Sequence, residues 1–300
     1  MFRNLTFFRF PPTLDFSALP ELVVDAALEP VGPLEFHSQG FLHPYGLGHE
    51  AGVVQTGKAI WLTVGSESKI LPGSAVNDAL HKKVAEIEDR EGQKIGARAR
   101  KRIKDDLVHE MLPRALVKTG RTDAVLFPDL GLLVVDTSSR KRAEGVVSEI
   151  RGALGGFPAL PVNAEVSPRS VMTAWLAGES MPDWLALGED AELRDPMQGG
   201  GVVKIQSQEL ATAEGEVDEH LAAGKKVTKL GMALQDQLSF VIGEDLVVRK
   251  LRFLDGAMDK LPEIVEDARG ELDARFALMY GEIRILFALL EAAFKISRAA

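Results

Sequence analysis

Apolar residues along this chain follow two different spacings, which alternate from one segment to the next. Short apolar runs are typical of strands, whereas apolar residues that recur every three or four positions are typical of amphipathic helices. In the first half of the chain these patterns predict strands over residues 5–10, 59–64, 125–127 and 132–136, and helices over residues 15–28, 74–90, 98–118 and about 139–154. The last two strands form a hairpin, because the Pro and Gly between them supply the turn dihedrals.

Serine, asparagine and proline residues indicate where three of these helices begin or break. Ser74 or Asn77 can cap the second helix, and Ser138 or Ser139 can cap the fourth, because their side-chain oxygens accept bonds from free N–H groups of the first turn. Pro113 lies inside the third helix and lacks an N–H, so that helix is expected to kink or restart there.

A stretch rich in Pro and Gly, residues 155–168, is the candidate boundary between two α+β halves, residues 1–160 and residues 161–300. Beyond the boundary the patterns predict a strand over residues 202–206, a helix over about 212–223 and a basic β-meander over residues 225–234, 238–242 and 246–253.

The final helix carries an apolar stripe with spacings of 4, 3, 4, 3, 4 and 4 residues, formed by Leu272, Phe276, Met279, Ile283, Leu286, Leu290 and Phe294. This spacing places the side chains on one face of an α-helix. Packing into the protomer's own core is favoured over a helix-to-helix dimer seam, which remains the alternative.

Charge changes the picture, because basic residues are concentrated locally in a chain whose net charge is −9. Residues 58–121 contain 14 basic and 9 acidic side chains, whereas residues 162–221 contain 3 basic and 12 acidic ones. The densest basic stretch has six Lys or Arg in eleven residues: Lys94, Arg98, Arg100, Lys101, Arg102 and Lys104. A second basic group lies in the meander: Lys225, Lys226, Lys229, Arg249, Lys250 and Arg252. Such clusters face either solvent or an anionic partner such as phosphate.

Several classes of protein are disfavoured by what the sequence lacks. With no Cys there is no disulfide framework and no thiolate metal site or nucleophile, which fits a reducing cytoplasm. The amino terminus is a poor signal peptide, and no apolar run approaches the ~18 to 20 residues that a bilayer requires, so no membrane partner is expected. Phosphate-loop, dinucleotide and zinc-peptidase motifs are missing, so neither a cofactor nor a resident metal is predicted.

One metal-site alternative stays open. His37, His43 and His49 recur at six-residue intervals in a Gly- and Pro-rich loop, which could fold around an ion. Adjacent carboxylates such as Asp105 and Asp106 could hold magnesium in a nuclease, although neighbouring residues on a helix do not face one site. Ordinary loop histidines and a solvated acidic turn are the favoured interpretation.

Four segments, in order, resemble the recombination-associated protein RdgC family: SESKILPGSAVNDAL from Ser66, DDLVHEMLPRAL from Asp105, GGVVKIQSQEL from Gly200 and AGKKVTKLGMALQDQLSFVI from Ala223. The FRNL opening and the closing FALMYGEIRILFALLE helix extend the resemblance over essentially the whole chain. It implies a curved α+β protomer of mixed antiparallel sheets and helices, two of which meet at both ends in a ring-shaped homodimer around double-stranded DNA.

The resemblance also implies a function in which the protein catalyses no reaction. Members bind duplex DNA without marked sequence preference, limit the access of the RecA recombinase and act in replication-fork repair, which implies a cytoplasmic, nucleoid-associated protein. RecA would be affected indirectly, through the DNA. A metal-dependent nuclease and a protein-interaction scaffold without DNA affinity remain the alternatives.

Individual residues match the family motifs. Lys69 lies in KILP, Arg114 in LPRA and Lys229 in VTKL, and Leu116 occupies a dimer-contact position where other members can have Phe. Where a relative can present Lys beside Gln, this chain keeps only Gln208, so DNA contact there is expected either to be weaker or to rely on Lys204. The expected DNA-binding set is Lys69, Arg98, Arg100, Lys101, Arg102, Lys104, Arg114, Lys204, Gln208, Lys225, Lys226, Lys229, Arg249, Lys250 and Arg252, and the expected dimer contacts are Met111 and Leu116.

Overall fold

The computed structural model describes residues 1–46, 48–197, 200–206, 210, 215–265 and 267–297, and it confirms the α+β class. The strands of the chain form two antiparallel sheets. The first has seven strands in the order β2-β4-β5-β6-β1-β7, with β3 beside β4. Their bounds are β1 Thr6–Arg9, β2 His37–Leu42, β3 Val54–Thr56, β4 Ala59–Ile70, β5 Leu116–Phe127, β6 Leu132–Val135 and β7 Leu160–Pro161.

The first sheet is apolar on both faces near its centre, so helices cover both sides. Alternate residues of a strand point to opposite faces. Phe8, Leu133 and Val135 pack with helix α1 (Leu19–Asp25) and helix α4 (Arg140–Leu154) in one buried cluster. Phe7 and Val134 pack on the other side with the final helix, α8 (Ala268–Phe294).

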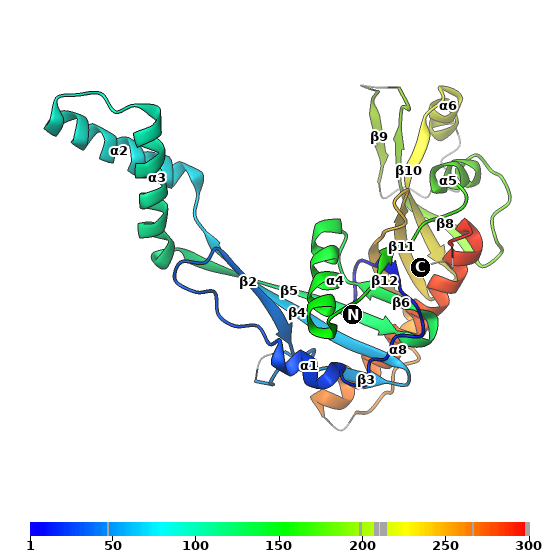
Figure 1. The fold of residues 1–300 in the computed structure, drawn as a ribbon. Helices are drawn as coiled ribbons and strands as arrows, with labels where there is room; N and C mark the ends of the chain where they lie inside the picture. The colour runs from blue at the N-terminus through cyan, green and yellow to red at the C-terminus, as the bar shows by residue number, and fades with distance from the viewer. Residues whose placement is uncertain (47, 198–199, 207–209, 211–214, 266, 298–300) are drawn as a thin grey trace.

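Strands β4 and β5 extend far beyond this core and support a helical arm. Residues 60–70 pair with residues 116–126 without interruption. Helix α2 (Gly73–Glu91), helix α3 (Ala97–Met111) and the 3₁₀ turn η1 (Leu112–Arg114) connect the outer ends of these two strands. We call these three elements the arm; Figure 1 shows it held away from the rest of the chain.

Two predictions about the arm were wrong. The helix predicted over residues 98–118 ends at Met111, because Pro113 interrupts the N–H ladder, and Leu116 begins a strand paired with Ile70. Neither Ser74 nor Asn77 caps α2, which begins at Gly73 after the extended residue Pro72. The strands predicted over residues 59–64 and 125–127 are parts of the longer β4 and β5.

The α2–α3 turn is held by one carboxylate. Glu88 accepts a bond from the backbone N–H of Ile95 at 2.9 Å and ion pairs from Lys94 at 2.9 Å and Arg100 at 3.2 Å. These bonds, the Ile95 N–H first, lower the pKa of Glu88 to about 2. Gly92 ends α2 in the left-handed region, at φ 67°, which glycine adopts without strain.

Neutralising Glu88 is therefore expected to loosen the turn. In Glu88→Gln at pH 7 the Ile95 amide should exchange its hydrogen several-fold faster, whereas Glu86→Gln, on the exposed face of α2, should leave it unchanged. Because the folded pKa is depressed, the wild-type stabilisation is present above the unfolded pKa of about 4.5 and is lost as the pH falls toward 2. Equal exchange in the two variants would contradict this role.

The second sheet contains the predicted meander and two further strands. Its order is β12-β11-β10-β8-β9. The bounds are β8 Leu185–Arg194, β9 Val202–Ile205, β10 Lys226–Leu234, β11 Leu238–Gly243 and β12 Val248–Phe253. Strand β8 was missed by the sequence analysis because register shifts against β10 break the alternation of apolar residues that marks a strand.

One face of the second sheet is buried under helices. Leu230, Met232 and Phe240 share a core cluster with helix α5 (Pro168–Leu176) and α8, and Trp175 lies 5.3 Å from Phe294 between ring centroids. Six of the seven residues of the α8 stripe, all but Leu272, lie in this cluster, which confirms that the stripe packs in the protomer's own core. The short helices α6 (Glu216–Ala222) and α7 (Asp255–Met258) complete the described elements, together with the turn η2 (Pro128–Leu130).

Of the remaining predicted boundaries, Ser139 is the cap of α4, since its hydroxyl accepts a bond from the N–H of Arg142. The helix predicted over residues 15–28 is limited to α1, because Asp15 instead binds Ser17 in a turn. Part of the helix predicted from residue 212 lies outside the described residues. The division at residue 160 stays a prediction. Among the described residues, no helix is long and apolar enough to cross a membrane.

Candidate nucleic-acid interface

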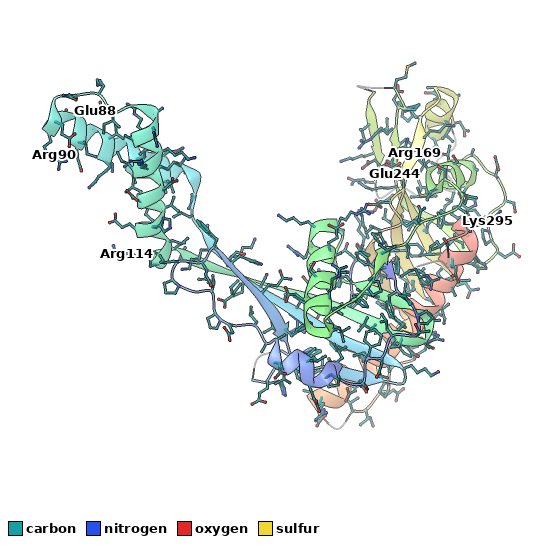
Figure 2. All side chains as sticks on the ribbon, viewed as in Figure 1. Glu88, Arg90, Arg114, Arg169, Glu244 and Lys295 are labelled. Carbon is teal, nitrogen blue, oxygen red and sulfur yellow. The ribbon has the colours of Figure 1, made fainter. Side chains whose placement is uncertain are left out.

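The arm and the second sheet rise on either side of α4, so the chain is curved and α4 lies within the curve (Figure 1). Side chains project from all three parts (Figure 2). Three groups of basic residues lie on the arm, in the groove beside α4, and on the face of the second sheet that α5 and α8 leave uncovered. These groups differ in whether their cations already have carboxylate partners.

On the arm, three cations in the first half of α3 are unpaired within the described part of the chain. Arg98, Lys101 and Arg102 are exposed and make no hydrogen bond or ion pair with any described residue. Arg100 is held by Glu88, and the Lys104 amine donates to Asn77 at 3.0 Å. Three unpaired cations within one and a half turns of a helix give this surface a compact positive charge.

Two motif residues lie at the inner end of the arm. Arg114 is exposed in η1 and has no partner among the described residues (Figure 2). Lys69 is half-buried in β4 and its amine donates to the Pro33 carbonyl at 2.6 Å. Of the two, Arg114 has the better access to a ligand.

A groove of about 620 Å³ beside α4 brings together cations that the sequence analysis missed. Lys118 reaches it from β5, and Lys141 and Arg142 from the first turn of α4. All three side chains are exposed and unpaired in the described part of the chain. Hydroxyl groups of Ser66, Ser68 and Thr119 line the same groove. Cations interleaved with small hydroxyls are typical of surfaces that contact phosphates.

The sequence contained a signal for this groove. Arg140, Lys141 and Arg142 are consecutive cations directly after the helix-capping Ser139. Lys118 was assigned to a helix, so its place on a strand beside α4 could not be foreseen. Arg140 itself is paired with Glu144 at 3.3 Å.

The uncovered face of the second sheet carries the second basic group, and three of its six cations are paired with carboxylates. Lys229 binds Glu192 at 2.9 Å, Lys250 binds Asp190 at 2.6 Å, and Arg249 binds Asp245 at 2.6 Å. A groove of about 330 Å³ is lined by Lys229, Arg249, Lys250 and the exposed Lys204. The structure therefore brings these four predicted residues together, three of them with a carboxylate.

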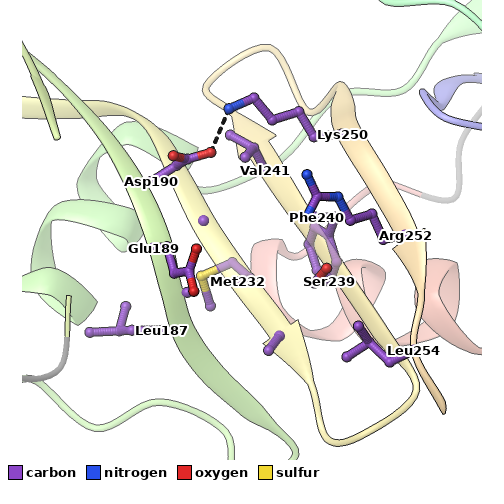
Figure 3. A pocket seen from close by; sticks show the side chains of 13 residues that line it. Leu187, Glu189, Asp190, Met232, Ser239, Phe240, Val241, Lys250, Arg252 and Leu254 are labelled. Atoms are coloured by element: carbon purple, nitrogen blue, oxygen red, sulfur yellow. Dashed lines mark hydrogen bonds and ion pairs between the residues drawn. The ribbon is translucent and has the colours of Figure 1, made fainter. Parts of the chain in front are cut away.

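The other predicted residues of this group lie at its edges. Lys226 is exposed at the start of β10, and the Lys225 amine lies 3.1 Å from Nδ1 of His220. Arg252 is exposed at the rim of a hollow of about 570 Å³ (Figure 3). Gln208 lies outside the described residues.

The predicted dimer contacts lie where the arm joins the strands. Leu116 is 76% exposed and pairs in register with Ile70, which is 46% exposed, so the two side chains share one face of the sheet. Met111 is half-buried nearby in sequence, at the end of α3. We call Ile70 and Leu116 the Ile70–Leu116 patch; an exposed apolar pair of this kind is available to another apolar surface.

The prediction of one loop that holds His37, His43 and His49 was wrong, because His37 begins strand β2 and the three side chains do not meet at one point. His43 and His49 lie 4.8 Å apart between ring centroids, but His37 bonds to Ser68 and Gln39 on the sheet. Burial and the neighbouring His49, Arg269 and Arg121 lower the pKa of His43. Within the described ranges, no group of three or more His, Asp or Glu side chains has the arrangement of a metal site.

A family model described as "Putative exonuclease, RdgC" matches residues 1–297. The recombination-associated protein RdgC of Xanthomonas oryzae pv. oryzae (strain MAFF 311018) is 59% identical over 301 residues, 99% of each chain. The protein of the same name from Stenotrophomonas maltophilia (strain R551-3) is 56% identical over 305 residues, also 99% of each chain. A family match over almost the whole length, with relatives this similar, shows that the chain belongs to the RdgC family.

Proposed function

We propose that the protein binds double-stranded DNA without sequence preference and encloses it as a ring-shaped homodimer. The observation that carries this proposal is the set of unpaired cations on the arm and beside α4, in a chain whose net charge is −9. A uniformly acidic chain would repel DNA, whereas cations concentrated within a curve attract it. The acidic side chains are concentrated elsewhere along the chain, above all in residues 162–221.

The chemistry of the groups favours contact with the backbone of DNA. Lys, Arg and hydroxyl groups bind phosphates, and such contacts position a protein without reading bases. Binding of this kind releases counterions, so affinity should fall steeply with salt and depend little on sequence. Closure of a ring would also keep the protein on the DNA, because the duplex would pass through the ring.

Ring closure requires contacts between copies, and the Ile70–Leu116 patch supports one of them. Leu in place of a larger aromatic residue can still fill an apolar pocket, though with less contact area. Met111 would contribute at the same end of the protomer.

The proposed role is to limit recombination by occupancy. The relatives are named recombination-associated proteins. Rings on duplex DNA would obstruct RecA filaments and strand exchange, which also suits a nucleoid-associated protein of the cytoplasm that acts in replication-fork repair. RecA-driven strand exchange should slow as the DNA is saturated with the protein; an unchanged rate at saturation would contradict this mechanism.

No chemical step is part of the proposal. The alternative of a metal-dependent nuclease predicts that labelled duplex is shortened in magnesium or manganese, and that replacing His43 or His49 abolishes the cleavage. The alternative of a scaffold predicts no DNA binding at low salt. Intact DNA that is nevertheless bound would support the proposal against both.

The groove beside α4 gives a specific prediction. Replacing Lys118, Lys141 and Arg142 together by Gln should weaken duplex binding and reduce the slope of log affinity against log salt by up to about 2.7, since each phosphate contact contributes about 0.9. Arg140→Gln is the matched control for Arg142→Gln alone, because Arg140 is already paired with Glu144. An unchanged salt slope in the triple variant would exclude the groove from the interface.

A further inference from the structure

The basic residues of the second sheet differ from those of the arm in one physical respect. On the arm, Arg98, Lys101 and Arg102 have no partner among the described residues. On the second sheet, Lys229, Arg249 and Lys250 each contact a carboxylate at 2.6–2.9 Å. A count of Lys and Arg along the sequence therefore overstates how much positive charge this face offers to an anion.

Two of the carboxylates lie beneath their cations. The side chain of Glu192 is 11% exposed and that of Asp190 is 23% exposed, whereas the Lys229 and Lys250 side chains are 40% and 57% exposed. Bonding to Lys229 lowers the pKa of Glu192, so this carboxylate is charged at neutral pH. A phosphate that approaches the face meets the two amines first, with negative charge directly behind them.

The surroundings leave room for such an approach. Small residues at the centre of the face, Gly231, Ala233 and Ser239, leave a hollow of about 570 Å³ next to the Lys250–Asp190 pair (Figure 3). The smaller groove that contains Lys229 and Lys204 adjoins it through Asp190 and Lys250. Ser138, which directly precedes the cap of α4, lines the smaller groove, so this face borders the α4 region.

We propose that Asp190 and Glu192 are built-in competitors of DNA phosphate, which hold Lys250 and Lys229 and thereby limit the affinity of the second sheet for the duplex. This inference rests on the proposed function. A cation that already has a carboxylate partner gains less from a phosphate, because binding exchanges one ionic contact for another and displaces fewer counterions. The arm and the α4 groove then supply the strong contacts, and the second sheet supplies weak, readily exchanged ones, which suits a ring that must move along DNA and leave it.

The test is to remove the negative charge while keeping the shape. Asp190→Asn and Glu192→Gln, singly and together, should each raise the affinity for a ~30-bp duplex at least about threefold and make its salt dependence steeper, by up to about 0.9 per freed amine. Glu179→Gln is the matched control: it makes the same charge change after α5, which packs on the opposite face of the sheet. The control should change affinity less than twofold.

A double-mutant cycle tests whether the gain in DNA affinity comes from the freed Lys250 amine. Lys250→Gln added to Asp190→Asn should abolish the gain, whereas Lys250→Gln alone should lower affinity, because it leaves the Asp190 carboxylate without its cation. Glu192 also bonds to Thr228 and pairs with Arg194 at 3.5 Å, so Glu192→Gln changes more than one contact; Asp190→Asn, which frees Lys250, tests the inference by itself. Circular dichroism establishes that each variant is folded.

The outcomes separate this inference from the proposed function. Unchanged or lower affinity in Asp190→Asn, while an arm variant loses binding, would overturn the inference and leave the DNA-binding function standing. No binding by the wild-type protein at low salt would overturn both. A gain as large in Glu179→Gln would show that net charge alone is responsible, and it would also overturn the inference.

Discussion

Duplex DNA binding should fall at least about tenfold at 0.15 M salt when Arg98, Lys101 and Arg102 are all replaced by Gln. These three side chains are exposed on α3 and unpaired within the described residues, so each is free to contact a phosphate. The salt slope should decrease by up to about 2.7, which is 0.9 for each contact removed. Fluorescence anisotropy at several salt concentrations measures both quantities.

The control for the arm variant also removes three positive charges, but outside the three basic groups. Lys58, Arg275 and Lys295 lie outside the three basic groups and are also exposed. Replacing them together by Gln should leave affinity within about threefold of wild type, since distant exposed charges are screened at this salt. Equal losses in the two triple variants would mean that net charge, and not the arm, determines binding.

A second large effect is expected on assembly. Leu116→Asp should convert a dimer to monomers, because a buried Leu contributes about 1.5–3 kcal/mol and a two-fold interface contains it twice. The dimer dissociation constant should therefore rise by ~100-fold or more, with a further loss from the buried charge. Sedimentation over a concentration series measures this constant.

Ile264→Asp is the matched control, because Ile264 is 87% exposed and lies far along the chain, before α8. It should leave the dissociation constant unchanged. A Leu116→Asp protein that remains dimeric would remove the Ile70–Leu116 patch from the interface, and a wild-type monomer at micromolar concentration would contradict the ring itself.

Elements of the fold were predictable where the burial of one face alone determines the spacing of the apolar residues. The stripe of α8 is apolar because one helix face is buried, and the meander strands alternate because one face of the sheet is covered. Strand β8 was not predictable because its register shifts interrupt the alternation, and the outer halves of β4 and β5 were not predictable because their residues are mostly polar.

The sequence predicted many of the cations of the candidate site, but not which of them are free to bind an anion. The sequence located the cations of α3 and of the meander, and the structure shows which of them are free. Asp190 and Glu192 belong to a strand that the sequence analysis did not identify, so their pairing with Lys250 and Lys229 could not be foreseen. Lys118 joins Lys141 and Arg142 only because β5 passes beside α4.

The most direct test of the central claim is a titration of two unrelated ~30-bp fluorescent duplexes at two salt concentrations, with and without magnesium. The account predicts equal affinities for the two sequences, a steep fall in affinity with salt, and DNA that remains intact. Failure to bind at low salt, a strong preference for one sequence, or shortened DNA in magnesium would contradict it.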